Sequence, residues 1–235
     1  METNIFEQMG GTFVRPAEQI GQKLKQIKAL VFDWDGVFNT GQKGGHLHSP
    51  FSEADSMGTN LLRYGLWLNT GQMPLTAIIT GAHNESAFDF AHRERFSAVF
   101  HRILDKKEAL QEFCRQQQIT PEEVAYFFDD ANDLAVAQVV GLRILIRRNA
   151  SPAFRHFVQQ AQLCDYITAL EGGAHALREA AEMMLWASGL DQAVFRSRML
   201  LDEPYRTYFQ ARQAMVTKFF SRSELDFIEF LPNPQ

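Results

Sequence analysis

The sequence predicts an α/β fold: a doubly wound, mostly parallel sheet of the Rossmann-like type. The continuous apolar runs at 29–32, 75–79 and 124–128 are typical of strands that are buried on both faces of a sheet. Each of these runs ends in small polar or acidic residues. Segments with helical spacing of apolar residues lie between the runs, and strands that alternate with helices form right-handed βαβ units.

The first half of the chain alternates in this way. A possible helix at 17–27 precedes strand 29–32, and helix 57–68 precedes strand 75–79. Residues 39–58 are rich in Gly, Ser, His and Asn, which favours a loop or β-hairpin. The next expected elements are helix 84–95 and strand 98–100.

The second half begins with clear helix signals. Asp105 precedes Lys106, Ala109, Leu110 and Phe113, which are spaced three or four residues apart. Thr120 and the Pro after it predict a single helical turn before strand 124–128. The remaining expected elements are helix 132–139, strand 143–146, helix 153–162, strand 165–167, and helix from 177 to the end with breaks near Gly189 and Pro204.

Composition limits the classes of function. The 235 residues carry a net charge of −5, which argues against a protein that binds nucleic acid by neutralising phosphates. The two cysteines, Cys114 and Cys164, form no disulfide framework and indicate a reducing compartment. We expect neither a secretory signal nor a membrane-spanning segment, and therefore a cytoplasmic location.

Candidate functional residues follow the predicted strands or open a helix. In open α/β sheets, ligands bind beyond the carboxyl ends of the strands. That rule selects four places: Asp33/Asp35, Thr80/Gly81, Asp105/Lys106 and Asp129/Asp130/Asp133. The carboxylates of the first and last places would repel each other unless a divalent cation held them. Because no His or Cys lies among them, the sequence predicts Mg²⁺ as the cofactor and not zinc.

These residue types are the ones that phosphoryl transfer requires. A metal and a lysine neutralise the transferring group, a hydroxyl binds it, and a carboxylate attacks it. Asp33 would attack phosphorus to give an aspartyl phosphate. Asp35 would protonate the leaving oxygen and then deprotonate the hydrolytic water.

The order and spacing of these residues resemble the four-motif signature of haloacid dehalogenase-like phosphatases over roughly 27–187. More narrowly, the chain resembles the 3-deoxy-D-manno-octulosonate 8-phosphate phosphatases and their sialic-acid-type relatives. The stretches that carry the likeness are Asp33-Trp34-Asp35-Gly36-Val37, continuing to Gly41, Ile78-Ile79-Thr80-Gly81, Lys106, Pro121 to Asp130 with Asp133, Asp165-Tyr166-Ile167-Thr168 and Gly172-Gly173 to Glu179.

The resemblance implies a role for each motif residue. Asp33 would be the nucleophile and Asp35 the acid/base, with Mg²⁺ held by Asp33, the Asp35 carbonyl and Asp129. Thr80, Gly81 and Lys106 would contact the substrate phosphate, and Asp130 and Asp133 would support the metal and the lysine. It also implies a homotetramer without a separate cap domain, in which a hairpin at 39–55 and a neighbour's tail help to close the site.

The sequence departs from the relatives' pattern at four positions. Phe128 replaces a glycine and should alter the approach to the metal loop. Ala54, Ala82 and Ala174 stand where arginines are expected, and alanine cannot bind an anion through two hydrogen bonds. A 2-keto-sugar-acid phosphate is therefore not favoured as substrate. His83 and His175, which follow two of these alanines, are candidate substrate-binding residues.

The chain divides into an arm (1–26), a catalytic domain (27–187) and a helical C-terminal extension (188–235). The extension contains six of the 20 phenylalanines. It either packs on its own domain as a helical pair or bridges subunits. Two functions remain: a Mg²⁺-dependent phosphatase of a small phosphorylated metabolite, for example a sugar phosphate, and a scaffold or regulatory protein that binds a ligand without turnover.

Overall fold

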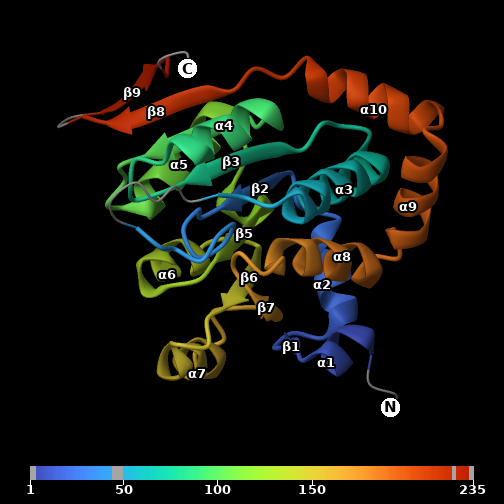
Figure 1. Cartoon of the computed structure of the whole chain (residues 1–235), viewed down its shortest axis with the longest axis horizontal. Coiled ribbons are helices and arrows are strands. Elements are labelled where there is room, and N and C mark those ends of the chain that lie inside the picture. The colour runs from blue at the N-terminus through green and yellow to red at the C-terminus, as the bar shows by residue number, and fades with distance from the viewer. Residues whose placement is uncertain (1–3, 44–49, 224–225, 233–235) are drawn as a thin grey trace.

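The structure is a computed structural model that describes residues 4–43, 50–223 and 226–232. Within these residues nine strands form one sheet in the order β1-β7-β6-β5-β2-β3-β4-β8-β9, with helices on both sides (Figure 1). The seven inner strands are parallel, and β1 and β9 are antiparallel to their neighbours. The predicted α/β class is confirmed. The strands are β1 Thr12–Phe13, β2 Ala29–Phe32, β3 Leu75–Ile79, β4 Ala98–His101, β5 Val124–Phe128, β6 Leu142–Arg147, β7 Tyr166–Glu171, β8 Lys218–Arg222 and β9 Phe227–Phe230.

The helices connect these strands. They are α1 Ile5–Met9, α2 Ala17–Leu24, α3 Glu53–Thr70, α4 Glu85–Arg93, α5 Lys106–Gln117, α6 Leu134–Ala137, α7 Pro152–Gln160, α8 Ala176–Ala187, α9 Asp191–Leu200 and α10 Glu203–Gln213, with 3-10 turns η1 Pro121–Glu123 and η2 Ala131–Asp133. Within the described ranges, no helix has the length and apolar character needed to cross a bilayer.

The central strand β2 contributes to two hydrophobic cores. Leu30 and Phe32 face a core that α2, α3, α4 and α8 cover, whereas Ala29 and Val31 face a core under α5, α6 and α7. All four residues are buried, as expected for a strand inside a doubly wound sheet. In the register of the sheet, Phe32 lies opposite Ile78 of β3 and Phe127 of β5. The residues that follow these strands therefore meet at one edge.

The segment after β2 differs in part from the prediction. Of the hairpin predicted at 39–55, residues 44–49 lie outside the described residues. The flanking segments 39–43 and 50–52 contain no strand. Residues 53–55 are helical because Ser52 caps α3, its hydroxyl accepting the Asp55 backbone N–H at 3.0 Å. Among the described residues no separate cap domain occurs.

The prediction of a wholly helical tail is wrong at its C-terminal end. Helices α9 and α10 pack against α3, but β8 and β9 follow them and extend the sheet beyond β4. In β8, Phe219 enters one core and Phe220 the other, which is the alternation of a strand and not of a helix. The tail thus packs on its own domain.

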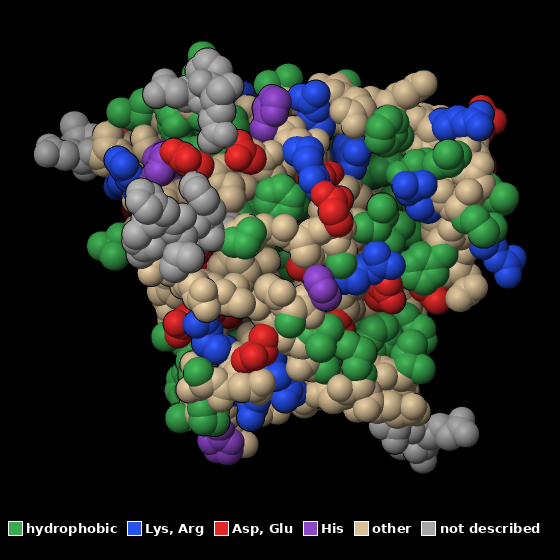
Figure 2. Space-filling view, in the orientation of Figure 1, with side chains coloured by type: hydrophobic (Ala, Val, Ile, Leu, Met, Phe, Trp, Pro, Cys, Tyr) green, Lys and Arg blue, Asp and Glu red, His purple; other side chains and the backbone are tan. Residues whose placement is uncertain are grey.

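Some apolar surface of the tail nevertheless remains exposed. Near α9 and α10 the space-filling view has several green side chains (Figure 2). The exposed fractions are 73% for Met199, 65% for Leu200 and 40% for Phe209. At the other end of the chain, β1 pairs with β7, so both arms join the sheet. The division into an arm, a catalytic domain and an extension remains a prediction.

Candidate active site

The candidate active site forms where β2 and β5 end. Asp33 follows β2 directly, and its backbone N–H donates to the Phe127 carbonyl at 2.9 Å. Its carboxylate Oδ1 lies 2.8 Å from Nζ of Lys106, the first residue of α5. Both side chains are almost fully buried. Asp105 fixes this end of α5 by accepting the backbone N–H groups of Lys107 and Glu108.

Asp133 holds the other side of Lys106. Its Oδ1 accepts hydrogen bonds from Lys106 Nζ at 2.7 Å and from the Tyr126 hydroxyl at 2.6 Å. Its Oδ2 is buried and has no hydrogen-bond partner among the described residues. A buried carboxylate oxygen without a partner is costly unless a cation or a ligand completes its environment.

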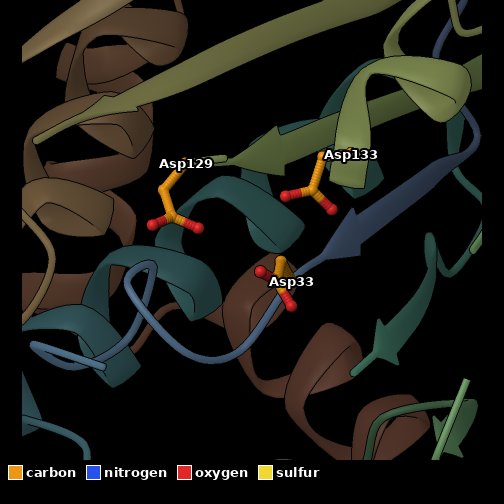
Figure 3. A group of neighbouring side chains, drawn as sticks. All are labelled: Asp33, Asp129 and Asp133. Atoms are coloured by element: carbon orange, nitrogen blue, oxygen red, sulfur yellow. The ribbon is translucent and has the colours of Figure 1, made fainter. Parts of the chain in front are cut away.

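Asp129 completes a group of three buried carboxylates. Asp33, Asp129 and Asp133 each offer one oxygen, and these oxygens lie within 4.8 Å of one another. The three side chains project into one space from the ends of β2 and β5 and from the turn after β5 (Figure 3). Arg148 forms an ion pair with Asp129. The all-oxygen donor set and the Oδ2 of Asp133 without a partner fit a hard divalent cation such as Mg²⁺.

The protonation equilibria reflect this crowding of negative charge. Burial and then the Asp133 carboxylate raise the pKa of Asp33 to about 8, although Lys106 opposes the shift. Burial raises the pKa of Asp129 to about 6, against the lowering effect of Arg148. Burial lowers the pKa of Lys106, but Asp33 and Asp133 outweigh it and the pKa is raised overall. A cation that neutralised the cluster would stabilise the ionised carboxylates.

Asn84 connects the other two predicted catalytic residues. Its side-chain amide donates to Oδ2 of Asp35 at 2.9 Å and to the Thr80 hydroxyl at 3.2 Å. Lys43 Nζ lies 2.6 Å from the same Asp35 oxygen. Asp35 and Thr80, which come from neighbouring strand ends, are therefore held by a common partner.

The loop after Asp33 packs tightly against the loop before α8. Gly36 has φ +88°, and a Cβ there would lie 2.1 Å from both Asp129 and Arg148. A Cβ on Gly172 would lie 2.0 Å from the Gly36 carbonyl oxygen. Both positions require glycine for close approach. The Gly172-Gly173 stretch therefore supports the backbone of the loop after Asp33.

The other predicted site residues have contacts of their own. Gly81 is exposed next to Thr80. The Asp130 side chain accepts the Ala131 N–H and caps η2. His83 contacts His101 and lines a surface hollow of about 950 Å³ beside α4. His175 lies at the start of α8, and its Nδ1 is 3.1 Å from the hydroxyl of Ser52.

Phe128 does not project over the metal loop, contrary to the expected effect of its bulk. The side chain is fully buried in the core under α5 and α6 and stacks on Tyr126, with ring centroids 5.8 Å apart. Because successive side chains of a strand alternate, a ring directed into this core leaves the next residue, Asp129, free to face the site.

The residues of the site that were not predicted include Asn84, Tyr126 and Arg148. Arg148 directly follows β6, so the strand-end rule would have selected it if the expected strand had extended to Arg147. Tyr126 lies inside β5, where only the structure reveals its contact with Asp133. Asn84 precedes α4, and no sequence signal distinguishes it from an ordinary helix cap.

The chain is similar to proteins of known function. Over 176 residues the chain is 30% identical to 3-deoxy-D-manno-octulosonate 8-phosphate phosphatase KdsC of Escherichia coli strain K12. The matched residues make up 73% of this chain and 86% of that protein. The chain belongs to the haloacid dehalogenase-like phosphatases. Within that family it is close to KdsC, and it is a phosphoric monoester hydrolase. No family model matches the chain.

Solved structures of this phosphatase family have the same fold. The 3-deoxy-D-manno-octulosonate 8-phosphate phosphatase of Moraxella catarrhalis, in complex with magnesium, phosphate and KDO, superposes with a TM-score of 0.64 at 27% identity, covering 77% of this chain and 98% of that one. The enzyme of the same name from Yersinia pestis gives a TM-score of 0.61 at 28% identity, with coverages of 74% and 88%. About a quarter of this haloacid dehalogenase-like chain thus lies outside the match.

Proposed function

We propose that this phosphatase hydrolyses a small phosphorylated metabolite, in the first place a sugar phosphate, with Mg²⁺ as cofactor and through an aspartyl phosphate on Asp33. The observation that carries the proposal is the buried Asp33 carboxylate, held 2.8 Å from Lys106 inside a group of three carboxylates. A carboxylate fixed beside an ammonium group is positioned to attack a phosphoryl group whose charge that ammonium neutralises.

The site residues have defined roles in this mechanism. Asp33 attacks phosphorus, and Asp35 donates a proton to the leaving oxygen and later takes one from water. Lys106, Thr80 and Gly81 bind the phosphoryl oxygens, while Asp133 keeps Lys106 in place. Asp130 supports the metal loop by capping η2, which begins directly after it.

The metal would be held by Asp33, Asp129 and the Asp35 carbonyl. When bound, Mg²⁺ neutralises charge on the phosphoryl group and on the carboxylates. The magnesium and phosphate in the Moraxella catarrhalis relative support this choice of cation.

The substrate class follows from the relatives and from the departures. The related enzymes carry the name of a sugar-acid phosphate, which supports a phosphorylated sugar. Ala54, Ala82 and Ala174 stand in place of three expected arginines that could bind a carboxylate. We therefore propose a phosphorylated substrate whose leaving group is not a sugar acid. His83 and His175 would contact that group. We also propose that the protein is cytoplasmic and forms a homotetramer. Light scattering tests the tetramer, because it should give a molar mass four times that of the chain.

The variant Asp33→Asn tests the mechanism. It should abolish Mg²⁺-dependent release of phosphate from a generic phosphate ester while the circular dichroism spectrum stays unchanged. Asp191→Asn, in the first turn of α9, serves as the matched control and should keep full activity. Wild-type turnover by Asp33→Asn would exclude Asp33 as the nucleophile.

A second function, a scaffold that binds a ligand without turnover, is favoured only by the three alanines. A panel of sugar phosphates and other metabolite phosphates separates the two functions. Release of phosphate from any of them supports the enzyme. Tight binding of one compound with no release from any member supports the scaffold.

A further inference from the structure

Arg148 brings a positive charge to one of the proposed metal ligands. It follows β6 at the carboxyl edge of the sheet, and β6 lies beside β5, whose end carries Asp129. The Arg148 guanidinium forms an ion pair with the Asp129 carboxylate. The Arg148 side chain is 33% exposed, whereas that of Asp129 is 2% exposed. A partly exposed cation therefore holds a buried carboxylate.

The nucleophile loop is shaped to admit this guanidinium. Gly36 and Gly41 both have positive φ, +88° and +73°. A Cβ would lie 2.1 Å from the Arg148 Nη2 at Gly36 and 3.3 Å from it at Gly41. Two glycines thus leave the space that Arg148 fills. The ion pair is built into the loop and is unlike a chance contact between two surface side chains.

The charge of the cluster explains what the ion pair does. Three carboxylates, those of Asp33, Asp129 and Asp133, face each other, and Lys106 balances only one of the negative charges. Arg148 balances a second. A divalent cation on Asp129 would use the same carboxylate and would be repelled by the guanidinium beside it.

We propose that Arg148 is a resident counter-ion of the metal site, which pairs with Asp129 in the metal-free protein and competes with the metal for it. The inference rests on the proposed metal site. It makes Arg148 a positioning residue with two opposite effects. The guanidinium stabilises the metal-free fold, and it weakens the affinity for Mg²⁺.

Calorimetric titration of the full chain with Mg²⁺ at constant pH tests the competition. Because a hydrogen bond between charged groups must be broken for the metal to bind, Arg148→Gln should lower the dissociation constant for Mg²⁺ by about tenfold or more. Its metal-free melting temperature should fall, and the rise in melting temperature on adding Mg²⁺ should exceed that of the wild type. A merely structural role for Arg148 would weaken the binding of Mg²⁺ or leave it unchanged.

Three further variants make the outcome unambiguous. Arg115→Gln removes the same charge from an exposed pair with Glu112 on α5, and should bind Mg²⁺ like the wild type. Arg148→Lys keeps the charge but loses the planar donor group, so its dissociation constant should fall less. It serves if Arg148→Gln does not fold. Asp129→Asn should lose the metal.

The results separate the inference from the function on which it rests. An unchanged or higher dissociation constant in Arg148→Gln, with normal binding by the wild type, overturns the competition alone. Equal binding by the wild type and Asp129→Asn, or none by the wild type, overturns the proposed metal site and the competition with it.

Discussion

Replacing Gly172 by alanine tests whether a loop distant in sequence positions Asp33, the proposed nucleophile. The added Cβ would lie 2.0 Å from the Gly36 carbonyl oxygen and 2.7 Å from the Asn39 carbonyl oxygen, where ordinary contacts begin at 3.4 Å. Both neighbours are backbone atoms and cannot rotate away. The two loops must therefore separate by roughly 1 Å, because overpacking is relieved by backbone shifts. Gly36 lies three residues after Asp33, so that shift reaches Asp33.

The expected magnitude follows from that displacement. A misplacement of about 1 Å from a mutation away from the reacting atoms can lower a rate by about 100-fold. The clash itself should cost about 1–3 kcal/mol of unfolding free energy. We therefore expect Gly172→Ala to fold and to bind Mg²⁺ while kcat on a generic phosphate ester falls by about two orders of magnitude.

A matched glycine provides the control. Gly71, which ends α3, has φ +69° and open space around its Cβ position. Gly71→Ala should cost about 1–2 kcal/mol through the left-handed backbone, with no change in kcat. Urea denaturation measures the free energies and a phosphate-release assay the rates. If Gly172→Ala kept kcat within threefold of the wild type, the loop contact would not position Asp33.

Two further predictions concern stability. Burial raises the pKa of Asp165, but hydrogen bonds from Arg143 and Arg15 outweigh it and hold the pKa below its usual value. The stabilisation is thus present above about pH 4 and is lost as the pH falls further. Between pH 3 and 7 the melting temperature of Asp165→Asn should change less with pH than that of the wild type, and an equal pH dependence in the two proteins would contradict this. Phe220→Ala should lower the free energy of unfolding by about 3–5 kcal/mol in urea denaturation, because the ring is buried and stacks on Phe100 at 4.8 Å. Ile228→Ala on exposed β9 should cost far less, and equal effects would show that β8 does not extend the sheet and its core.

The sequence predicts the inner strands better than the ends of the chain. The predicted bounds of β2, β3 and β5 match the structure because buried parallel strands are short, continuous apolar runs. The pairing of β8 with β4 joins residues more than a hundred positions apart, such as Phe220 and Phe100. No local pattern reports such a partner, and the surrounding residues of the tail favour helix.

The candidate site also contains residues that the sequence predicts and residues that it does not. Asp33, Thr80 and Asp129 could be predicted because each follows a strand and parallel strands bring their ends to one edge of the sheet. Lys106 opens a helix and was predicted from the spacing of the family motifs; the structure places its Nζ 2.8 Å from Asp33. Arg148 was not predicted because the predicted strand stopped at Ile146, one residue before the end of β6 at Arg147. An error of that size at a strand end is enough to miss a residue that is selected only because it follows the strand.

The phenylalanine content of the chain is part of the same electrostatic argument. Asp33 follows Phe32, and Asp129 follows Phe128, and both rings are buried in the cores that flank the sheet. The apolar cores leave the carboxylates little solvent, and this desolvation is the largest contribution to the raised pKa of Asp33 and of Asp129. Every cation near the cluster is consequently worth more than it would be in water, since attraction between charges grows as the dielectric constant falls. The aromatic cores therefore do more than hold the sheet together. By excluding solvent from the carboxylates, they strengthen the attraction of these groups for Lys106, for Arg148 and for the proposed metal ion.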